Sequence, residues 1–215
     1  SGVASYNVDD FKPDIEIDDD EIRLETGNLE VSGVPKFDQE LKNEWDLKFS
    51  AMPMQLSINA GAYEGNFEFG GLALQSLEVT DGAANVKLKF SQPNLTVMDV
   101  LRYITGASNV TLSGLGNANF RSMTFRSGAG DYTLDFSGKL QNDAVVAVES
   151  GISRVVIIVP EGVSAKLIFK GGLANIRASG GWEKSGDEYT ISGSGPSLLI
   201  TVDMGAGNLE LRTSQ

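Results

Sequence analysis

The feature that most constrains this chain is an apolar frame that recurs around a series of glycines. Each of these glycines has apolar residues five and three positions before it, and four and six positions after it. The frame is present at Gly82, Gly106, Gly128, Gly151, Gly172 and Gly205. Gly27 and Gly61 keep it with a short deletion or insertion, and five of the seven intervals lie between 21 and 24 residues. A structural repeat of about 22 residues follows from this spacing.

The alternation on each side of the glycine predicts two strands, each with one face in the core. From the last apolar position before the glycine to the first one after it is seven residues, an odd number. A straight strand would therefore send the second apolar pair to the opposite face. The chain has to turn or bulge at the glycine, and Gly, Ala, Ser and Asn in this segment favour left-handed and tight-turn conformations.

A unit with two strands and two corners corresponds to one coil of a β-solenoid, in which coils stack about 4.8 Å apart. We therefore expect an all-β protein, a β-solenoid or β-helix-like stack of about eight such units. A β-sandwich of hairpins is the alternative. The expected organisation is one elongated domain over residues 1–215. Residues 1–55 would form an N-terminal cap and first coil, and residues 56–215 the regular coils, with a loop insertion at 180–197.

Composition excludes several functional classes. The chain has 17 basic and 29 acidic residues and a formal net charge of −12, which argues against binding to nucleic acid or to an anionic membrane surface. It has no histidine and no cysteine, so Ser-His-Asp and Cys-His catalysis and His- or Cys-based zinc sites are ruled out. No segment approaches the ~20 apolar residues of a membrane span, so membrane attachment would need a segment outside this chain.

Two segments exceed the repeat length. Val34–Met54 contains Trp45, and Trp182–Pro196 contains Trp182 and Tyr189. Insertions in repeat proteins form loops on one face, and such loops often bind partners. Alternatively, these aromatic residues cover the ends of the stack, where open strand edges need protection, and this is the favoured interpretation.

The strand "RVVIIVP" is apolar on both faces, since Val156 and Ile158 lie out of phase with the inward positions. Its outer face needs a cover, and a cover from within the chain is the favoured interpretation. An exposed face at Val156 would instead be an association site.

The densest carboxylate cluster is Asp18–Glu21, within the run Asp14–Glu25. A calcium site needs six to eight oxygens in a fixed loop, and no EF-hand spacing is present. The run is better interpreted as Ile15, Ile17, Ile22 and Leu24 facing inward and acids facing outward, with a turn at Asp18–Asp20. We assign no catalytic, cofactor-binding or metal-binding residue, and expect no cofactor.

Two stretches resemble a known family. They are "VESGISRVVIIVPEGVSAKLIFKGGLANIRASG", residues 148–180, and "LLITVDMGAGNLELR", residues 198–212. They are similar to the C-terminal region of bacterial LiaF-type cell-wall-active-antibiotic response proteins, and to the wider group of toastrack domains, which are adhesin-like domains of unknown function. The repeated corner extends the resemblance over the chain from about Ser57, and the first 55 residues match less clearly.

The resemblance implies a stacked β architecture, an extracytoplasmic or membrane-proximal setting and no enzymatic activity. It supplies no functional residue. We therefore expect a non-catalytic domain of the bacterial cell envelope, at the cell surface or in the periplasm and anchored through residues that precede this chain. Its role would be sensing, or binding a protein or cell-wall glycan partner. The alternatives are a structural module that self-assembles through its coils and, more weakly, a carbohydrate-active enzyme on a β-helix that uses paired carboxylates.

Overall fold

The structure is a computed structural model that describes residues 1–27 and 42–214. The chain divides into two compact units, Ser1–Ser50 and Ala51–Gln215. The described secondary structure is strand apart from two short 3-10 helices, η1 (Asp9–Phe11) and η2 (Leu115–Ala118). The predicted all-β class is confirmed.

The first unit contains two small antiparallel sheets. Strand β1 (Gly2–Tyr6) pairs with β4 (Asn43–Leu47). Strand β2 (Pro13–Asp18) pairs with β3 (Glu21–Thr26), and the hairpin between them turns at the predicted place, Asp19 and Asp20. Asp19 has a φ of 40°, which aspartate tolerates better than most residues.

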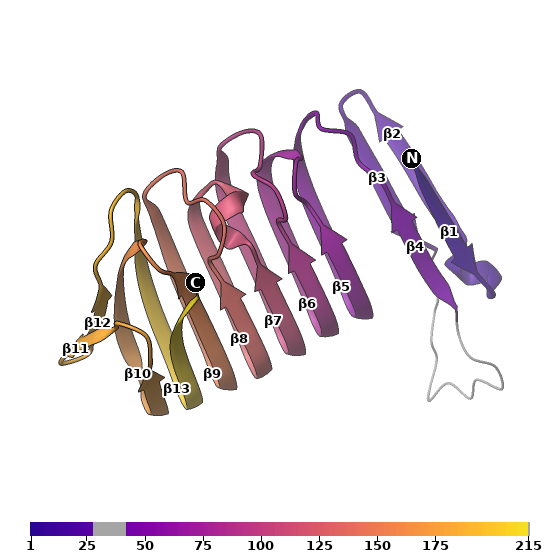
Figure 1. The fold of residues 1–215 in the computed structure, drawn as a ribbon. Helices are drawn as coiled ribbons and strands as arrows, with labels where there is room; N and C mark the ends of the chain where they lie inside the picture. The colour runs from indigo at the N-terminus through magenta and orange to yellow at the C-terminus, as the bar shows by residue number, and fades with distance from the viewer. Residues whose placement is uncertain (28–41, 215) are drawn as a thin grey trace. The chain divides into compact units, whose positions relative to one another are not determined.

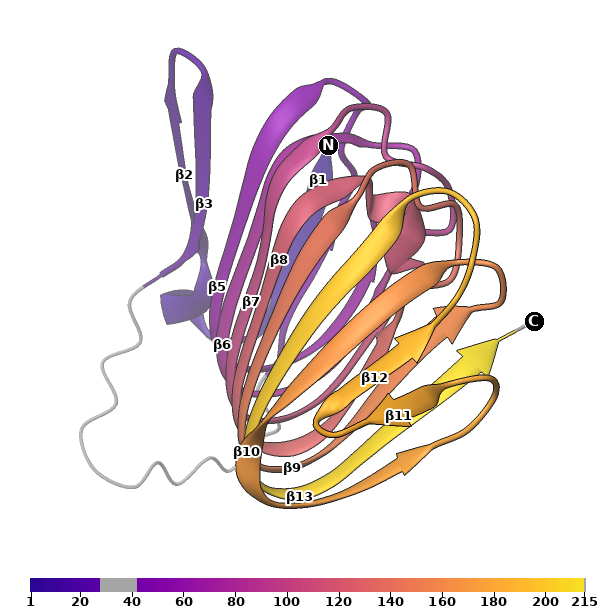
Figure 2. The same cartoon turned by 90° about the vertical axis from the view of Figure 1, so that its left-hand side faces the viewer.

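The second unit is a nine-stranded sheet in which seven long strands lie parallel and in register (Figure 1). These strands, called the stack below, are β5 (Pro53–Glu68), β6 (Ala73–Lys89), β7 (Met98–Ser113), β8 (Phe120–Asp135), β9 (Ala144–Pro160), β10 (Ser164–Ala178) and β13 (Ser197–Ser214). Two short antiparallel strands, β11 (Glu183–Ser185) and β12 (Glu188–Ile191), extend the sheet beyond β10. Each long strand bends back on itself, so that the core lies between its two arms (Figure 2).

The bend occurs at the glycines of the repeat, and it keeps both apolar sets inside as predicted. In β7, for example, Leu101 and Tyr103 precede Gly106 while Val110 and Leu112 follow it, and all four side chains are buried. Parallel pairing in register stacks equivalent residues of successive strands, so the inward faces join into one continuous core.

The repeat glycines are required for a reason other than the expected one. None of those in the stack has a positive φ. Instead, each of them except Gly61 lies against the carbonyl group of the equivalent glycine in a neighbouring strand. A Cβ built on Gly128 would lie 2.7 Å from the carbonyl oxygen of Gly106, and one on Gly82 would lie 2.9 Å from that of Gly61. This glycine column therefore permits close backbone approach. The positions whose backbone has a positive φ, which favours glycine, lie two residues after a repeat glycine, at Gly130 and Gly207.

The described residues place seven coils in the stack, rather than about eight. The unit predicted around Gly27 is not a coil of it, because β3, which precedes that glycine, belongs to the separate hairpin with β2. The second half of that predicted unit lies outside the described residues. The organisation as one domain over residues 1–215, with a cap and first coil in residues 1–55, stays a prediction.

The strands do not stack in chain order. The last strand, β13, lies between β9 and β10, so β10 rather than β13 is at the end of the long-strand array. The inward residues of β13 are almost completely buried, whereas Phe169 and Ile176 of β10 are only partly buried. The difference in burial follows from position, because β13 has long strands on both sides and β10 has one on only one side.

Candidate functional site

The β10 end of the stack is only half covered. On the first arm of β10, strand β12 pairs with Ala165–Ile168, and Tyr189 of β12 and Leu167 are both buried. On the second arm, Leu173–Ala178 pairs with β13 on one side. Within residues 1–27 and 42–214, no strand pairs with its other side. We call this segment the open edge.

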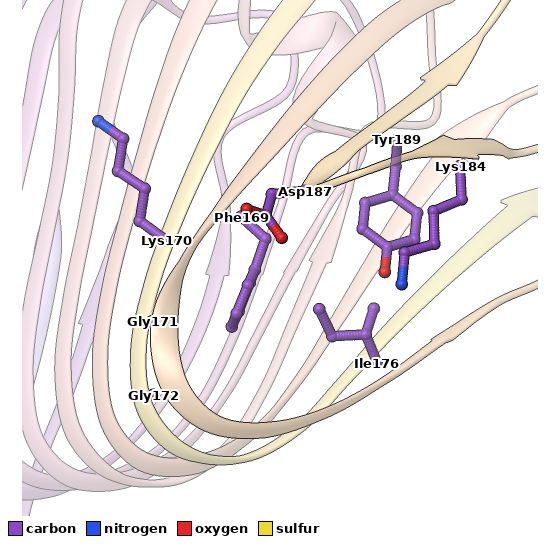
Figure 3. Close-up of a pocket in the computed structure, with 8 residues that line it drawn as sticks. All are labelled: Phe169, Lys170, Gly171, Gly172, Ile176, Lys184, Asp187 and Tyr189. Carbon is purple, nitrogen blue, oxygen red and sulfur yellow. The ribbon is translucent and has the colours of Figure 1, made fainter.

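Beside the open edge is a cleft of about 410 Å³ (Figure 3). Its apolar lining comes from Phe169, Ile176 and Tyr189, and its charged groups include Lys184 and Asp187. The backbone of Gly171 and Gly172 and the residue Lys170 complete the lining. The volume lies within the range of small-ligand sites, which combine apolar walls with a few polar groups.

The hairpin of β11 and β12 is attached firmly to β10. The backbone N–H of Phe169 donates a 2.9 Å hydrogen bond to the carbonyl oxygen of Asp187, and Lys166 forms a 2.7 Å ion pair with Glu188. Within the cleft, the Lys184 ammonium lies 5.5 Å from the centroid of the Tyr189 ring, in the range of a cation–π contact. The cleft thus offers apolar surface and charged groups of both signs on strands that are hydrogen-bonded to each other.

The structure places the Trp182–Pro196 insertion at this end. Trp182 packs against the core and Tyr189 is buried, as expected if these aromatic residues cover the stack. The expected loop carries the β11–β12 hairpin. In the other predicted segment, Val34–Met54, residues up to 41 lie outside the described part of the chain. Trp45 lies in β4, where its indole N–H donates a 2.9 Å hydrogen bond to Asn43 Oδ1.

The outer face at Val156 is covered from within the chain. Val156 is only 2% exposed and lies beside Glu210 of β13 in register. The Glu210 carboxylate accepts a 2.9 Å hydrogen bond from Arg154 and another from Arg212, both on the same outer face. These two guanidinium groups lower the pKa of Glu210. The favoured interpretation of this strand agrees with the structure, and Val156 is not available as an association site.

The acidic run forms the β2–β3 hairpin, with Asp18 opposite Glu21 at its closed end. Among the described residues, no three His, Cys, Asp or Glu side chains lie together as a metal ion would require. The isoleucines share one face as expected, but the prediction that they face inward was wrong. Ile15, Ile17 and Ile22 are 58%, 73% and 68% exposed.

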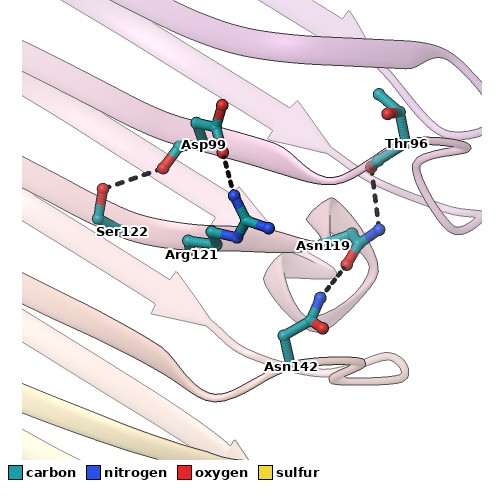
Figure 4. A network of polar contacts seen from close by, with 6 residues as sticks. All are labelled: Thr96, Asp99, Asn119, Arg121, Ser122 and Asn142. Atoms are coloured by element: carbon teal, nitrogen blue, oxygen red, sulfur yellow. Dashed lines mark hydrogen bonds and ion pairs between the residues drawn. The ribbon is translucent and has the colours of Figure 1, made fainter.

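Polar side chains bridge the second corners of neighbouring coils around β7 and β8 (Figure 4). The Asn119 amide donates a 2.9 Å hydrogen bond to the Thr96 carbonyl oxygen and accepts a 2.7 Å hydrogen bond from Asn142. Nearby, Arg121 forms a 2.7 Å ion pair with Asp99. A second depression of about 320 Å³ lies beside this network, with a mainly polar lining. These contacts follow the axis of the stack, so their evident role is to hold the corners in register.

Sequence reasoning missed the contribution of β10 to the cleft. Phe169 and Ile176 occupy standard inward positions of the repeat and carry no distinguishing signal of their own. They become part of a cleft only because β10 is at the end of the long strands. The weak signal that was present is the insertion after β10, since an interruption in a repeat often marks its end.

Comparison with known proteins agrees with this architecture. Residues 1–101 match the family model of the N-terminal domain of toast_rack, DUF2154. No curated protein matches the chain. The crystal structure of a "putative cell adhesion protein" from Clostridium sporogenes superposes with a TM-score of 0.51 at 18% identity, over 99% of this chain and 82% of that one. This likeness concerns the fold.

Within the described residues, no helix has the length and apolar character needed to cross a membrane. The family match covers the first unit and the first strands of the stack, and the stacked parallel strands continue the same architecture to the end of the described chain. Residues 1–101 are therefore similar to the N-terminal domain of toast_rack, and the described chain shares its fold with the Clostridium sporogenes protein.

Proposed function

We propose that this chain is a non-catalytic, adhesin-like binding module of the bacterial cell envelope. It acts outside the cytoplasm and recognises a protein or glycan partner through the cleft at the β10 end of the stack. The observation that carries the proposal is the half-covered end of the core, where Phe169, Ile176 and Tyr189 line a concave surface next to an open strand edge. The cell-adhesion description of the Clostridium sporogenes protein and the match to the N-terminal domain of toast_rack support the setting.

The composition of the cleft favours binding over hydrolysis. Glycoside cleavage uses two carboxylates that flank the scissile bond. Among the residues that line the cleft, Asp187 is the only carboxylate, and the cation Lys184 lies over the Tyr189 ring. An aromatic wall with charged groups of both signs is suited to orienting a bound group.

The test is binding of the purified chain to two envelope preparations, peptidoglycan sacculi and outward-facing membrane vesicles. Lys184→Glu and Asp187→Lys reverse exposed charges of the cleft, so both variants should fold. We expect each to weaken binding by roughly tenfold or more. Lys139→Glu, an exposed residue outside the cleft, is the matched control and should bind as the unmodified chain does.

Digestion of each preparation before the assay identifies the class of partner. Loss of binding after protease treatment indicates a protein, and loss after muramidase treatment indicates a glycan. Equal binding by the two cleft variants and the control would contradict the proposed site. Release of soluble sugar from the sacculi by the purified chain would contradict a non-catalytic role.

A further inference from the structure

Among the described residues, the β2–β3 hairpin has an apolar face that is largely exposed. Ile15 lies opposite Leu24 and Ile17 opposite Ile22, so four apolar side chains project from the same side of two paired strands. The isoleucines are more than half exposed. An isolated two-stranded hairpin is marginally stable in water, and clustered exposed apolar side chains usually mark an interaction site.

The other face of the hairpin is acidic, and the acids are concentrated on β2. Asp14, Glu16 and Asp18 alternate with the two isoleucines of that strand. On β3, the equivalent face carries Arg23, which lies 3.8 Å from Glu25. Strand β2 therefore combines apolar residues on one side with three carboxylates on the other.

The β10 end has the complementary properties. The open edge presents six residues, Leu173–Ala178, and β2 also has six. On its inner side Ile176 is partly exposed next to the cleft, and on its outer side Arg177 is exposed. Lys184 and Asp187 also lie at the cleft, whereas the Lys170 side chain points away from it (Figure 3). Within the open edge itself, Leu173–Ala178, the one charged residue is the cation Arg177, in a chain whose net charge is −12.

We propose that β2 of one copy of this chain adds as a strand to the open edge of β10 in a second copy. Backbone hydrogen bonds would extend the sheet, as in other cases of strand addition. An isoleucine of β2 enters the cleft beside Ile176, and the carboxylates of β2 lie on the side of Arg177. This inference rests on the proposed function, because it names a second copy of the chain as the partner of the same cleft.

Charge selects β2 over β3 as the added strand. If β3 occupied the edge, the face toward Arg177 would carry Arg23 between Glu21 and Glu25, a net charge of −1 compared with −3 for β2. The strand with the larger opposite charge is favoured beside Arg177. The contact joins two different surfaces, so each copy has one donor strand and one acceptor edge. Such a head-to-tail contact produces rings or open chains rather than a closed two-fold dimer.

The experiment uses the full chain and two complementary variants. Ile17→Lys disables the donor at a side chain that is 73% exposed, and Arg177→Glu disables the acceptor at an exposed position. We expect the mass of the unmodified chain, measured by sedimentation equilibrium, to rise with concentration and to fall again in high salt. Each variant alone should stay monomeric, and their equimolar mixture should form a dimer and no larger species.

Lys87→Glu is the control for charge reversal, because Lys87 occupies the position in β6 that Arg177 occupies in β10, within the stack. This variant should assemble as the unmodified chain does. Glu16→Arg alone and Arg177→Glu alone should each weaken the affinity between copies by roughly tenfold or more. The double variant with both changes should recover assembly, because the two charges are exchanged.

If the unmodified chain stayed monomeric at all concentrations, the inference would be overturned. The same result would follow if the hairpin bound to the open edge of its own chain, and it would count against the inference equally. A mixture of the two blocked variants that stays monomeric would overturn it as well. Envelope binding by a strictly monomeric chain would refute self-recognition and leave the proposed function intact. Assembly without any envelope binding would support strand addition and refute recognition of a separate envelope component.

Discussion

The hydroxyl of Tyr103 donates a 2.7 Å hydrogen bond to Asp81 Oδ2, which joins the core aromatic of β7 to a carboxylate of β6. Asp81 is only 6% exposed, and the Thr105 hydroxyl also donates to it. Tyr63 approaches the same carboxylate at 3.4 Å from β5. Three neighbouring strands are thus linked through one buried carboxylate at the bend of the stack.

Replacing Asp81 by alanine should destabilise the second unit by about 2–4 kcal/mol, because buried hydroxyl groups lose their acceptor. Tyr103→Phe removes one donor and should cost about 1–2 kcal/mol. Urea unfolding followed by tyrosine fluorescence measures both changes. Glu78→Gln, at an exposed position of the same strand as Asp81, should change the unfolding free energy by less than about 0.5 kcal/mol. A loss of similar size in this control would contradict a special role for the network.

The buried tyrosines should make stability fall at alkaline pH. Burial raises the pKa of Tyr63 to about 12, with a smaller contribution from the charge of Asp81, and burial also raises the pKa of Tyr103. An unfolded tyrosine ionises near pH 10. The folded state therefore holds these protons more tightly, and the stability that this provides is present below pH 10 and is lost as the pH rises to about 12.

Unfolding free energies measured at intervals from pH 9 to pH 12 should decrease, and Tyr63→Phe should decrease less steeply than the unmodified chain. Absorbance at 295 nm offers a direct readout, since Tyr63→Phe should lose an ionisation step near pH 12. An identical alkaline profile for this variant would count against the burial effect.

The glycine column gives a matched pair of substitutions. Gly128→Ala should destabilise by about 1–3 kcal/mol, because the new Cβ would lie 2.7 Å from the carbonyl oxygen of Gly106. Gly128→Val should cost more. Gly61 begins the column, and a Cβ added there would have no atom within 4 Å, so Gly61→Ala should be nearly neutral or slightly stabilising. Thermal unfolding monitored by circular dichroism distinguishes the two, and equal effects would show that close approach is not the reason for glycine.

Replacing the asparagine of the two Asn-x-Thr sites, Asn94 and Asn109, should have different effects on the free energy of unfolding. Asn94 is buried, and its side chain exchanges hydrogen bonds with both the N–H and the carbonyl oxygen of Leu74 and donates a third to the Thr96 carbonyl oxygen. Asn94→Ala should therefore cost about 2–3 kcal/mol. Asn109 is exposed on β7, and Asn109→Ala should change stability by less than about 0.5 kcal/mol. Denaturant titration of both variants measures the difference in unfolding free energy. Full stability of Asn94→Ala would contradict the prediction.

The sequence by itself determined the all-β class, the repeat length and the inward positions. Alternation with a period of two requires one face of each strand to be buried, and the odd interval across the glycine requires a bend. The burial of Leu101, Tyr103, Val110 and Leu112 around Gly106 follows from these two facts. Aromatic residues after β10 were also recognisable as a cover for an end of the stack.

The tertiary structure alone decided the order of the strands, the number of coils and the position of the cleft. Alternation specifies which face of a strand is buried but not which strands become its neighbours. That choice depends on how fully each strand can be enclosed. Strand β13 has buried apolar residues on both arms and lies between two neighbours, which leaves β10 with Phe169 and Ile176 at the half-covered end. The cleft, the open edge and the need for small residues in the glycine column all arise from contacts between strands. The sequence of a single strand therefore does not predict them.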